Sequence, residues 1–266
     1  MSMPGEQIIR LFFFLGVLAA IGVWEVIAPR RQLTDNKGRR WLTNLSLVVI
    51  DTAVVRFFLP VIPVGMALMA QQQGWGILNI ITLSPWIKTI LVIVALDFVI
   101  YLQHVLFHFL PILWRLHRMH HTDLDIDVTT GNRFHPIEIV ISIWIKMAAV
   151  ALIGPPAMAV VIFEVVLNAS SQFNHGNIRI PALLDGWLRL VVVTPDMHRV
   201  HHSVIPRETN SNFGFNLPWW DYLCGTYRPQ PELGHTGMSI GIKEFRNPLM
   251  LTLSRLLIQP LIRKSM

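Results

Sequence analysis

Long apolar runs separated by short polar segments dominate the chain. A helix of about 20 residues crosses the ~30 Å hydrocarbon core of a bilayer, and the first apolar run has that length. The second run is longer and is broken by Pro60 and Pro63, so it is either one kinked helix or a span followed by a re-entrant piece. The pattern predicts an all-α integral membrane protein with about four to five transmembrane helices. The five runs are Ile8–Ala28, Trp41–Ala70, Pro85–Gln103, Ile137–Ile153 and Pro155–Gln172.

The last two runs are expected to form a hairpin. Gly154-Pro155-Pro156 lies between them and cannot continue a helix. Lys146 and Glu164 lie about equally far from this turn, so the hairpin should set them at the same depth as a structural ion pair. The first run is expected to be a retained span and not a signal peptide, because Glu25 interrupts its end and no small-x-small cleavage site follows.

The distribution of basic residues predicts the orientation. Residues 29–40 contain five Lys or Arg, whereas residues 71–84 and the Gly-Pro-Pro turn contain none. The positive-inside rule therefore places residues 29–40 in the cytoplasm, and counting the crossings places residues 103–136 and the chain after Gln172 on the same side. Every histidine lies in these segments or at their membrane edge. We therefore expect a histidine-rich helical cap on the cytoplasmic side.

Composition supports a membrane protein organised as a single domain. The chain is 53% hydrophobic and 14% charged, with a mean hydropathy of +0.50, whereas soluble domains carry about 25% charged residues. The net charge of +6 comes from residues that flank apolar segments, which favours anionic lipid headgroups over nucleic acid as the partner. The single Cys224 excludes an intramolecular disulfide and a cysteine-rich metal site.

No linker or low-complexity tract divides the sequence, so we expect one membrane domain over residues 1–266. Within it, residues 1–84 form the N-terminal spans, residues 85–230 the histidine-rich core and residues 231–266 a tail. In the tail, Asn247–Lys264 is either an interfacial amphipathic helix or a short helix packed on the bundle.

Nine histidines are spaced as metal ligands. One pair is four residues apart, and two HxxHH boxes each place three imidazoles on one helical face. A further histidine follows Asn174; alone it would more often be a hydrogen-bonded core residue than a ligand. Imidazole binds iron, zinc, copper and nickel, and a tetrahedral zinc takes four ligands, so nine histidines predict two metal ions. The candidate ligands are His104, His108, His117, His120, His121, His175, His198, His201 and His202.

The order of these groups resembles the fatty acid hydroxylase/sterol desaturase superfamily of membrane di-iron enzymes. The stretch LWRLHRMHHTD at residues 113–123 is similar to the second histidine box of that superfamily, and TTGNRFHPIE at 129–138 to the segment that follows it. The last box and its tail are matched by residues 194–203, 212–214 and 220–227. The resemblance covers roughly residues 90–230. One departure is Ser171, where some members carry an additional histidine.

The resemblance implies an O2-dependent oxidoreductase. Its cofactors would be two iron ions, for which zinc can substitute in purified protein, and its co-substrate O2. It would hydroxylate or desaturate a lipid that enters from the bilayer, and sterol, fatty acyl chain, ceramide, alkylglycerol and carotenoid all remain open. No GxGxxG fingerprint is present, so electrons should come from a partner protein such as a ferredoxin, a rubredoxin or a cytochrome b5 system.

Two other classes of function use the same histidines. One is a zinc-dependent membrane hydrolase that activates water. The other is a metal transporter or sensor, which would place its ligands along a pathway at mid-membrane depth. The histidines mostly follow the ends of apolar runs, so transport is the weaker hypothesis.

Polar residues near the boxes are expected to orient the imidazoles by accepting their ring N–H groups. Asp97, inside the third run, is either one of these or a packing partner of Arg56. His135 is expected beside the metals or the substrate, in preference to being a ligand. The expected supporting residues are Asp97, Asp123, Asp127, His135, Glu138, Asn174 and Asp196.

Overall fold

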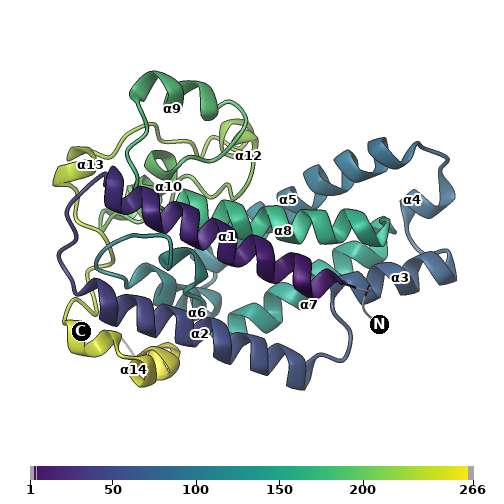
Figure 1. The fold of residues 1–266 in the computed structure, drawn as a ribbon, viewed down its shortest axis with the longest axis horizontal. Coiled ribbons are helices and arrows are strands. Elements are labelled where there is room, and N and C mark those ends of the chain that lie inside the picture. The colour runs from purple at the N-terminus through teal and green to yellow at the C-terminus, as the bar shows by residue number, and fades with distance from the viewer. Residues whose placement is uncertain (1–2, 4, 263–266) are drawn as a thin grey trace.

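The computed structural model describes residues 3 and 5–262 (Figure 1). Within these residues the regular structure is helical, and the β contacts are two isolated bridges, Pro29–Ile178 and Ser203–Ile240. Five helical segments are long and apolar enough to cross a membrane, which confirms the predicted all-α membrane fold. They are α1 (Glu6–Ile27), the stretch Lys37–Ile80 that contains α2 (Lys37–Phe58), α3 (Pro63–Gln73) and α4 (Ile77–Ile80), then α5 (Pro85–Phe109), α7 (Pro136–Ile153) and α8 (Ala157–Asn174).

Shorter helices connect and follow these spans. They form a cap at one end of the molecule, the end at which α1 terminates and α2 begins (Figure 1). The cap elements are α6 (Pro111–His121), η1 (Thr130–Asn132), α9 (Ala182–Leu188), α10 (Pro195–His201), α11 (Pro206–Thr209), α12 (Trp219–Leu223), α13 (Gly234–Gly237), η2 (Pro248–Leu251), α14 (Leu253–Ile258) and η3 (Gln259–Leu261).

Prolines set several helix boundaries. The second apolar run is two helices, because α2 ends at Phe58 and α3 begins at Pro63 after four non-helical residues. Pro85, Pro111 and Pro136 each begin a helix, a position at which the missing amide hydrogen costs nothing. The third span extends beyond its predicted end at residue 103, and α5 continues through both of its histidines to Phe109.

The predicted α7–α8 hairpin is present. Gly154 ends α7 with φ 68°, a conformation that favours glycine, and the two prolines lead into α8. The turn packs tightly on the loop before α4: a Cβ on Gly76 would lie 2.2 Å from the Gly154 nitrogen. The hairpin is thereby fixed against the α3–α4 end of the bundle.

The C-terminal tail packs on the cap as short helices. Leu251 and Leu256 are buried against Leu47 of α2 and Met119 of α6. The Arg118 guanidinium donates to the carbonyl oxygens of Gln259 and Ile262, each at 2.6 Å. Of the two alternatives for Asn247–Lys264, the packed short helix is therefore the one observed, and residues 263–264 lie outside the described residues.

An ionic cluster joins three helices. The predicted pair is confirmed, with Lys146 Nζ 3.1 Å from Glu164 Oε1. Arg10 of α1 is a third member that the sequence pattern did not predict, and its Nη2 lies 2.6 Å from Glu164 Oε2. Glu164 therefore holds α1 as well as α7 against α8.

This geometry predicts unequal effects for two leucine substitutions. Lys146→Leu leaves the Arg10–Glu164 pair in place, so metal binding should be retained and stability should change little. Glu164→Leu leaves the partly buried Lys146 and Arg10 without this carboxylate and should cost about 1–3 kcal/mol of unfolding free energy. Thermal unfolding and metal analysis of both variants would check this. Loss of metal from Lys146→Leu with the fold intact would contradict a purely structural role.

Candidate metal centre

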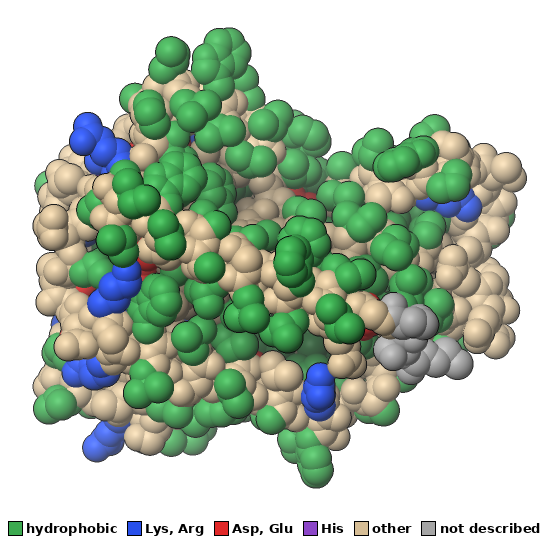
Figure 2. Space-filling model, viewed as in Figure 1, with side chains coloured by type: hydrophobic (Ala, Val, Ile, Leu, Met, Phe, Trp, Pro, Cys, Tyr) green, Lys and Arg blue, Asp and Glu red, His purple; other side chains and the backbone are tan. Residues whose placement is uncertain are grey.

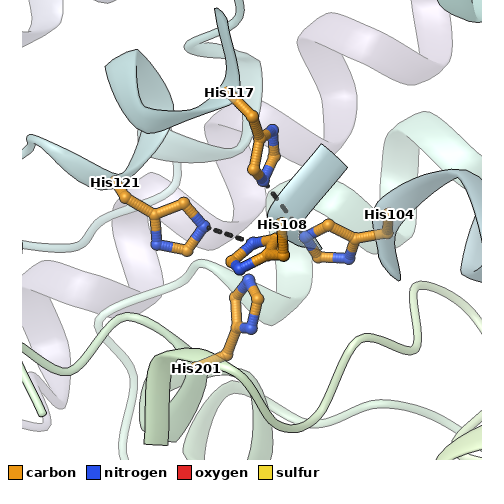
Figure 3. Close-up of side chains that lie close together, drawn as sticks. All are labelled: His104, His108, His117, His121 and His201. Carbon is orange, nitrogen blue, oxygen red and sulfur yellow. Dashed lines mark hydrogen bonds between the residues drawn. The ribbon is translucent and has the colours of Figure 1, made fainter. Parts of the chain in front are cut away.

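Nine histidines converge in the cap end of the bundle. They come from α5, α6, the end of α8 and α10, and their side chains are all buried. They form two groups, and within each group every histidine offers a ring nitrogen that lies within 4.8 Å of the others. Figure 3 shows the first group, with rings from α5, α6 and α10 pointing toward a common centre. The first group is His104, His108, His117, His121 and His201; the second is His120, His175, His198 and His202.

Each HxxHH box contributes to both groups. In the first box, His117 and His121 belong to the first group and His120 to the second; in the other box the i+3 residue, His201, joins the first group while His198 and His202 join the second. A helix turns about 100° per residue, so positions i and i+4 diverge by only about 40° whereas i+3 points about 60° to the other side of i. One box can therefore reach two adjacent centres.

The ring tautomers of the first group are set by acceptors behind the rings. His104 Nδ1 lies 2.8 Å from the carbonyl oxygen of Phe213, and His117 Nδ1 lies 2.6 Å from Glu138 Oε1. Each acceptor requires the hydrogen to be on Nδ1, so the Nε2 atom of the neutral ring presents a lone pair. These two Nε2 atoms face each other at 3.2 Å. Two facing lone pairs repel each other, whereas a cation held between them would be bound by both.

The second group repeats this arrangement. His120 Nδ1 lies 3.2 Å from the Arg133 carbonyl oxygen and His175 Nδ1 lies 2.6 Å from that of Ser171, while their Nε2 atoms are 3.0 Å apart. His198 and His202 bring their Nε2 atoms within 3.1 and 3.2 Å of His175 Nε2. Ligands about 2.1 Å from a metal are separated by about 3 Å when they occupy adjacent positions around it. The residues present therefore fit a bound metal.

Protonation of the rings does not remove the repulsion between the facing lone pairs, because the rings stay neutral. Burial lowers the pKa of His117 and of His175 to about 3, and burial together with neighbouring imidazoles lowers the pKa of His120 well below its usual value. Neutral imidazole is the form that binds metals.

The loop between α11 and α12 orients three of the rings. Besides Phe213, which holds His104, the loop supplies Asn210 Oδ1 at 3.2 Å from His108 Nδ1 and the Ser211 carbonyl oxygen at 2.8 Å from His201 Nδ1. The loop is itself fixed by Asp221, whose carboxylate accepts from the amides of Phe213 and Gly214, both at 2.8 Å. These supporting residues were not predicted; their only signal in the sequence is the similarity of 212–214 and 220–227 to the superfamily.

Of the expected supporting residues, Glu138 alone contacts a ring of the two groups. The expectation for Asp97 was wrong in both forms. Its carboxylate accepts from the amides of Asn216 and Leu217, each at 3.2 Å, and from the Trp220 indole at 2.8 Å. Arg56 donates instead to Gln7. Asp97 thus anchors the loop between α11 and α12 to α5, because these donors surround it.

Asp123 and Asp127 were also expected to face imidazoles, and this was wrong. Both pair with the buried Arg40 of α2, at 2.8 and 2.5 Å. Burial acts to raise the pKa of Asp123, but the guanidinium groups of Arg40 and Arg133 outweigh it and hold that pKa below its usual range. A buried guanidinium attracts these carboxylates more strongly than a neutral imidazole does.

The expectations for Asp196 and Asn174 were wrong in the same respect, whereas the position of His135 beside the metals or the substrate stays a prediction. Asp196 binds Arg30 at 3.0 Å and also pairs with Arg199. His135 caps α7 through Nδ1 and donates from Nε2 to the carbonyl oxygen of Leu257 at 3.1 Å. Asn174 donates to the Phe215 carbonyl oxygen at 3.1 Å.

Ser171, which stands where some superfamily members carry an additional histidine, has a packing role in this structure. The Ser171 hydroxyl donates to the Gly131 carbonyl oxygen at 2.6 Å, and its own carbonyl accepts from His175. A Cβ on Gly131 would lie 2.3 Å from the Ser171 oxygen. Ser171 therefore packs α8 against η1 and orients His175.

Glu138 offers a test of this support. Glu138→Gln keeps an acceptor oxygen for His117 but removes the negative charge, so we expect metal affinity of the first group to fall by about 10- to 100-fold. Metal titration of the purified chain measures the change. Glu232→Gln, an exposed cap carboxylate, serves as the control and should leave affinity unchanged. Equal affinities for Glu138→Gln and the wild type would contradict the role of Glu138.

Comparison with known proteins gives a consistent family. The fatty acid hydroxylase family matches residues 89–226, slightly more than half of the chain. Over 85% of this chain, the sequence is 26% identical to the ornithine lipid hydroxylase of Rhizobium tropici. Over 90% of this chain it is 32% identical to the alkylglycerol monooxygenase of Xenopus tropicalis, and over 65% it is 30% identical to the human enzyme of that name. The matches cover 69%, 51% and 38% of the length of these three relatives, in that order. No solved structure matches.

The matched segment contains all nine clustered histidines, Glu138 and the loop that orients His104, His108 and His201. The residues that make up the two imidazole groups are thus the part of the chain shared with these enzymes, and the chain belongs to the fatty acid hydroxylase family.

Proposed function

We propose that this chain is a membrane-bound di-iron oxygenase that hydroxylates a lipid. The observation that carries the proposal is the pair of buried imidazole groups in which Nε2 lone pairs face each other at 3.0–3.2 Å. The relatives support the reaction type, since their names describe a hydroxylase and monooxygenases of lipids. They favour hydroxylation over desaturation, and they do not favour the zinc-dependent hydrolase.

The first group would hold one iron ion with up to five imidazoles and the second group would hold the other with four. Bound iron supplies the activation of O2 that hydroxylation of an unactivated C–H bond requires. The chain keeps the imidazoles neutral by burial, directs the Nδ1 hydrogens of six of the nine rings to carbonyl, carboxylate or amide oxygens, and excludes bulk water from both groups. Water exclusion protects a reactive site from side reactions.

The surroundings of the site support three further parts of the proposal. The whole chain acts as one membrane domain, because the cap helices pack on the spans through buried contacts such as Met119 on Leu47. The cap faces the cytoplasm, as the basic segment 29–40 indicates. Electrons come from a separate protein that docks on the cap.

The substrate is a membrane lipid, and lipid analysis can identify it. Extracts of cells that express the wild-type chain under 18O2 should contain a lipid that gains one labelled oxygen atom. A His120→Ala, His121→Ala variant removes one ligand from each group and should abolish the product. His235→Gln changes a histidine outside both groups and should retain it. Product formation by the double variant, or a hydrolysed lipid together with stoichiometric zinc, would overturn the proposal.

A further inference from the structure

A polar pocket and an apolar groove adjoin where α1 ends and α2 begins. The pocket, about 230 Å³, is lined by Glu25, Pro29, Arg31, Gln32, Leu33, Lys37 and Asn177. The groove, about 630 Å³, is lined by seven residues of α1 between Leu15 and Ile27 and by Trp41 of α2. The Lys37 ammonium lies 5.1 Å from the centre of the Trp41 ring, so one residue pair borders both spaces. Neither space contains a clustered histidine.

The polar pocket contains one buried acceptor and one buried donor without hydrogen-bond partners. Glu25 is 5% exposed. Its Oε1 accepts from the amides of Val128 and Asn177, at 2.7 and 2.9 Å, whereas its Oε2 accepts no hydrogen bond and lies 3.6 Å from the Lys37 ammonium. Arg31 donates through Nη1 to the Met238 carbonyl oxygen, while its buried Nε–H has no partner. Buried polar groups are normally paired, so these two atoms point to a ligand.

The depth of the two spaces identifies the kind of ligand. A helix of 22 residues is about 33 Å long, so α1 crosses the hydrocarbon core and its last turn lies at the headgroup level. The groove therefore faces acyl chains and the pocket faces headgroups. Figure 2 shows hydrophobic side chains over the length of the helices on this face, with most of its visible Lys and Arg at the cap end. A lipid would fill both spaces together.

The charges specify the headgroup. Arg31 and Lys37 attract an anionic group, and the free Glu25 oxygen accepts from an ammonium N–H. We propose that this site binds a zwitterionic membrane lipid whose headgroup carries both an anionic group and a primary ammonium. A quaternary ammonium has no N–H for Glu25, and a headgroup with hydroxyls in place of the ammonium offers this carboxylate only neutral donors. The site should therefore select among lipids with the same acyl chains.

Native mass spectrometry of the purified full chain can measure this selection. The chain is incubated with equal amounts of phosphatidylethanolamine, phosphatidylcholine and phosphatidylglycerol of identical acyl composition, and the retained lipid is counted. We expect the ethanolamine lipid to be retained at least about tenfold over the other two. Glu25→Gln keeps the Oε1 acceptor for Val128 and Asn177, so it should fold, and it should reduce the ratio to about one. Glu232→Gln is the matched control and should retain the preference.

A second pair of variants tests the acyl groove. Ala19→Trp places a large side chain in the groove and should lower retention of all three lipids, whereas Ala20→Trp, exposed but outside the groove, should not. Equal retention of the three lipids by the wild type, or an unchanged preference in Glu25→Gln, would reduce the site to unselective lipid contact and overturn the proposal. The measurement counts bound lipid without turnover, so its outcome is independent of the oxygenase proposal.

Discussion

A His120→Ala, His202→Ala variant is expected to bind one iron ion per chain in place of two and to lose lipid hydroxylation. It leaves the second group with His175 and His198 alone, while the five rings of the first group remain. Loss of a residue that only supports a metal ligand costs about 10- to 100-fold, so removing two ligands should reduce turnover by more than about 100-fold. Iron content by mass spectrometry and product analysis under 18O2 provide the two readouts.

Comparison with His235→Gln separates loss of ligands from general damage to the cap. His235 is buried near Asp196 at 3.5 Å and belongs to neither group. This control should retain two iron ions and full turnover. If the double variant loses both irons while its thermal unfolding is unchanged, the two groups are one interdependent site. Retention of both irons would show that His120 and His202 are not ligands.

Arg40→Ala is expected to have the largest effect on stability. Arg40 is 3% exposed and its guanidinium contacts Asp123, Asp127 and the Thr130 hydroxyl. Alanine would leave two buried carboxylates without their counter-ion, at a cost of about 3–5 kcal/mol. Since proteins are stable by only about 5–15 kcal/mol, the unfolding temperature should fall by roughly 10 °C.

Two neighbouring substitutions calibrate this result. Arg39 is half-buried and pairs with Asp35 at 2.5 Å, so Arg39→Ala should cost less than about 1 kcal/mol. Arg40→Lys keeps the charge but cannot bind Asp123 through two nitrogens, so its stability should lie between those of wild type and Arg40→Ala. If Arg40→Ala unfolded at the same temperature as the wild type, the buried carboxylates would not depend on Arg40.

Local patterns in the sequence determined the spans and the helical spacing of the histidines. Apolar runs of membrane length became α1, α5, α7 and α8, and prolines marked where helices begin or break, because these features depend on a few consecutive residues. The Lys146–Glu164 pair was also predictable, since one tight turn fixes the register of the hairpin. Arg10 was not, because it reaches Glu164 from 154 residues away.

Only the tertiary structure decided how the imidazoles are grouped and what surrounds them. An HxxHH box predicts rings on one helical face, but the distribution of its rings between two centres depends on where α5, α8 and α10 lie around α6. The partners of the acidic residues were likewise decided by the tertiary structure. Asp97 and Asp123 lie near histidines in the sequence, yet each accepts hydrogen bonds from stronger donors in distant segments. The spacing of residues along a helix depends on the local sequence, whereas the partner of a buried charge depends on which distant segments the fold packs beside it.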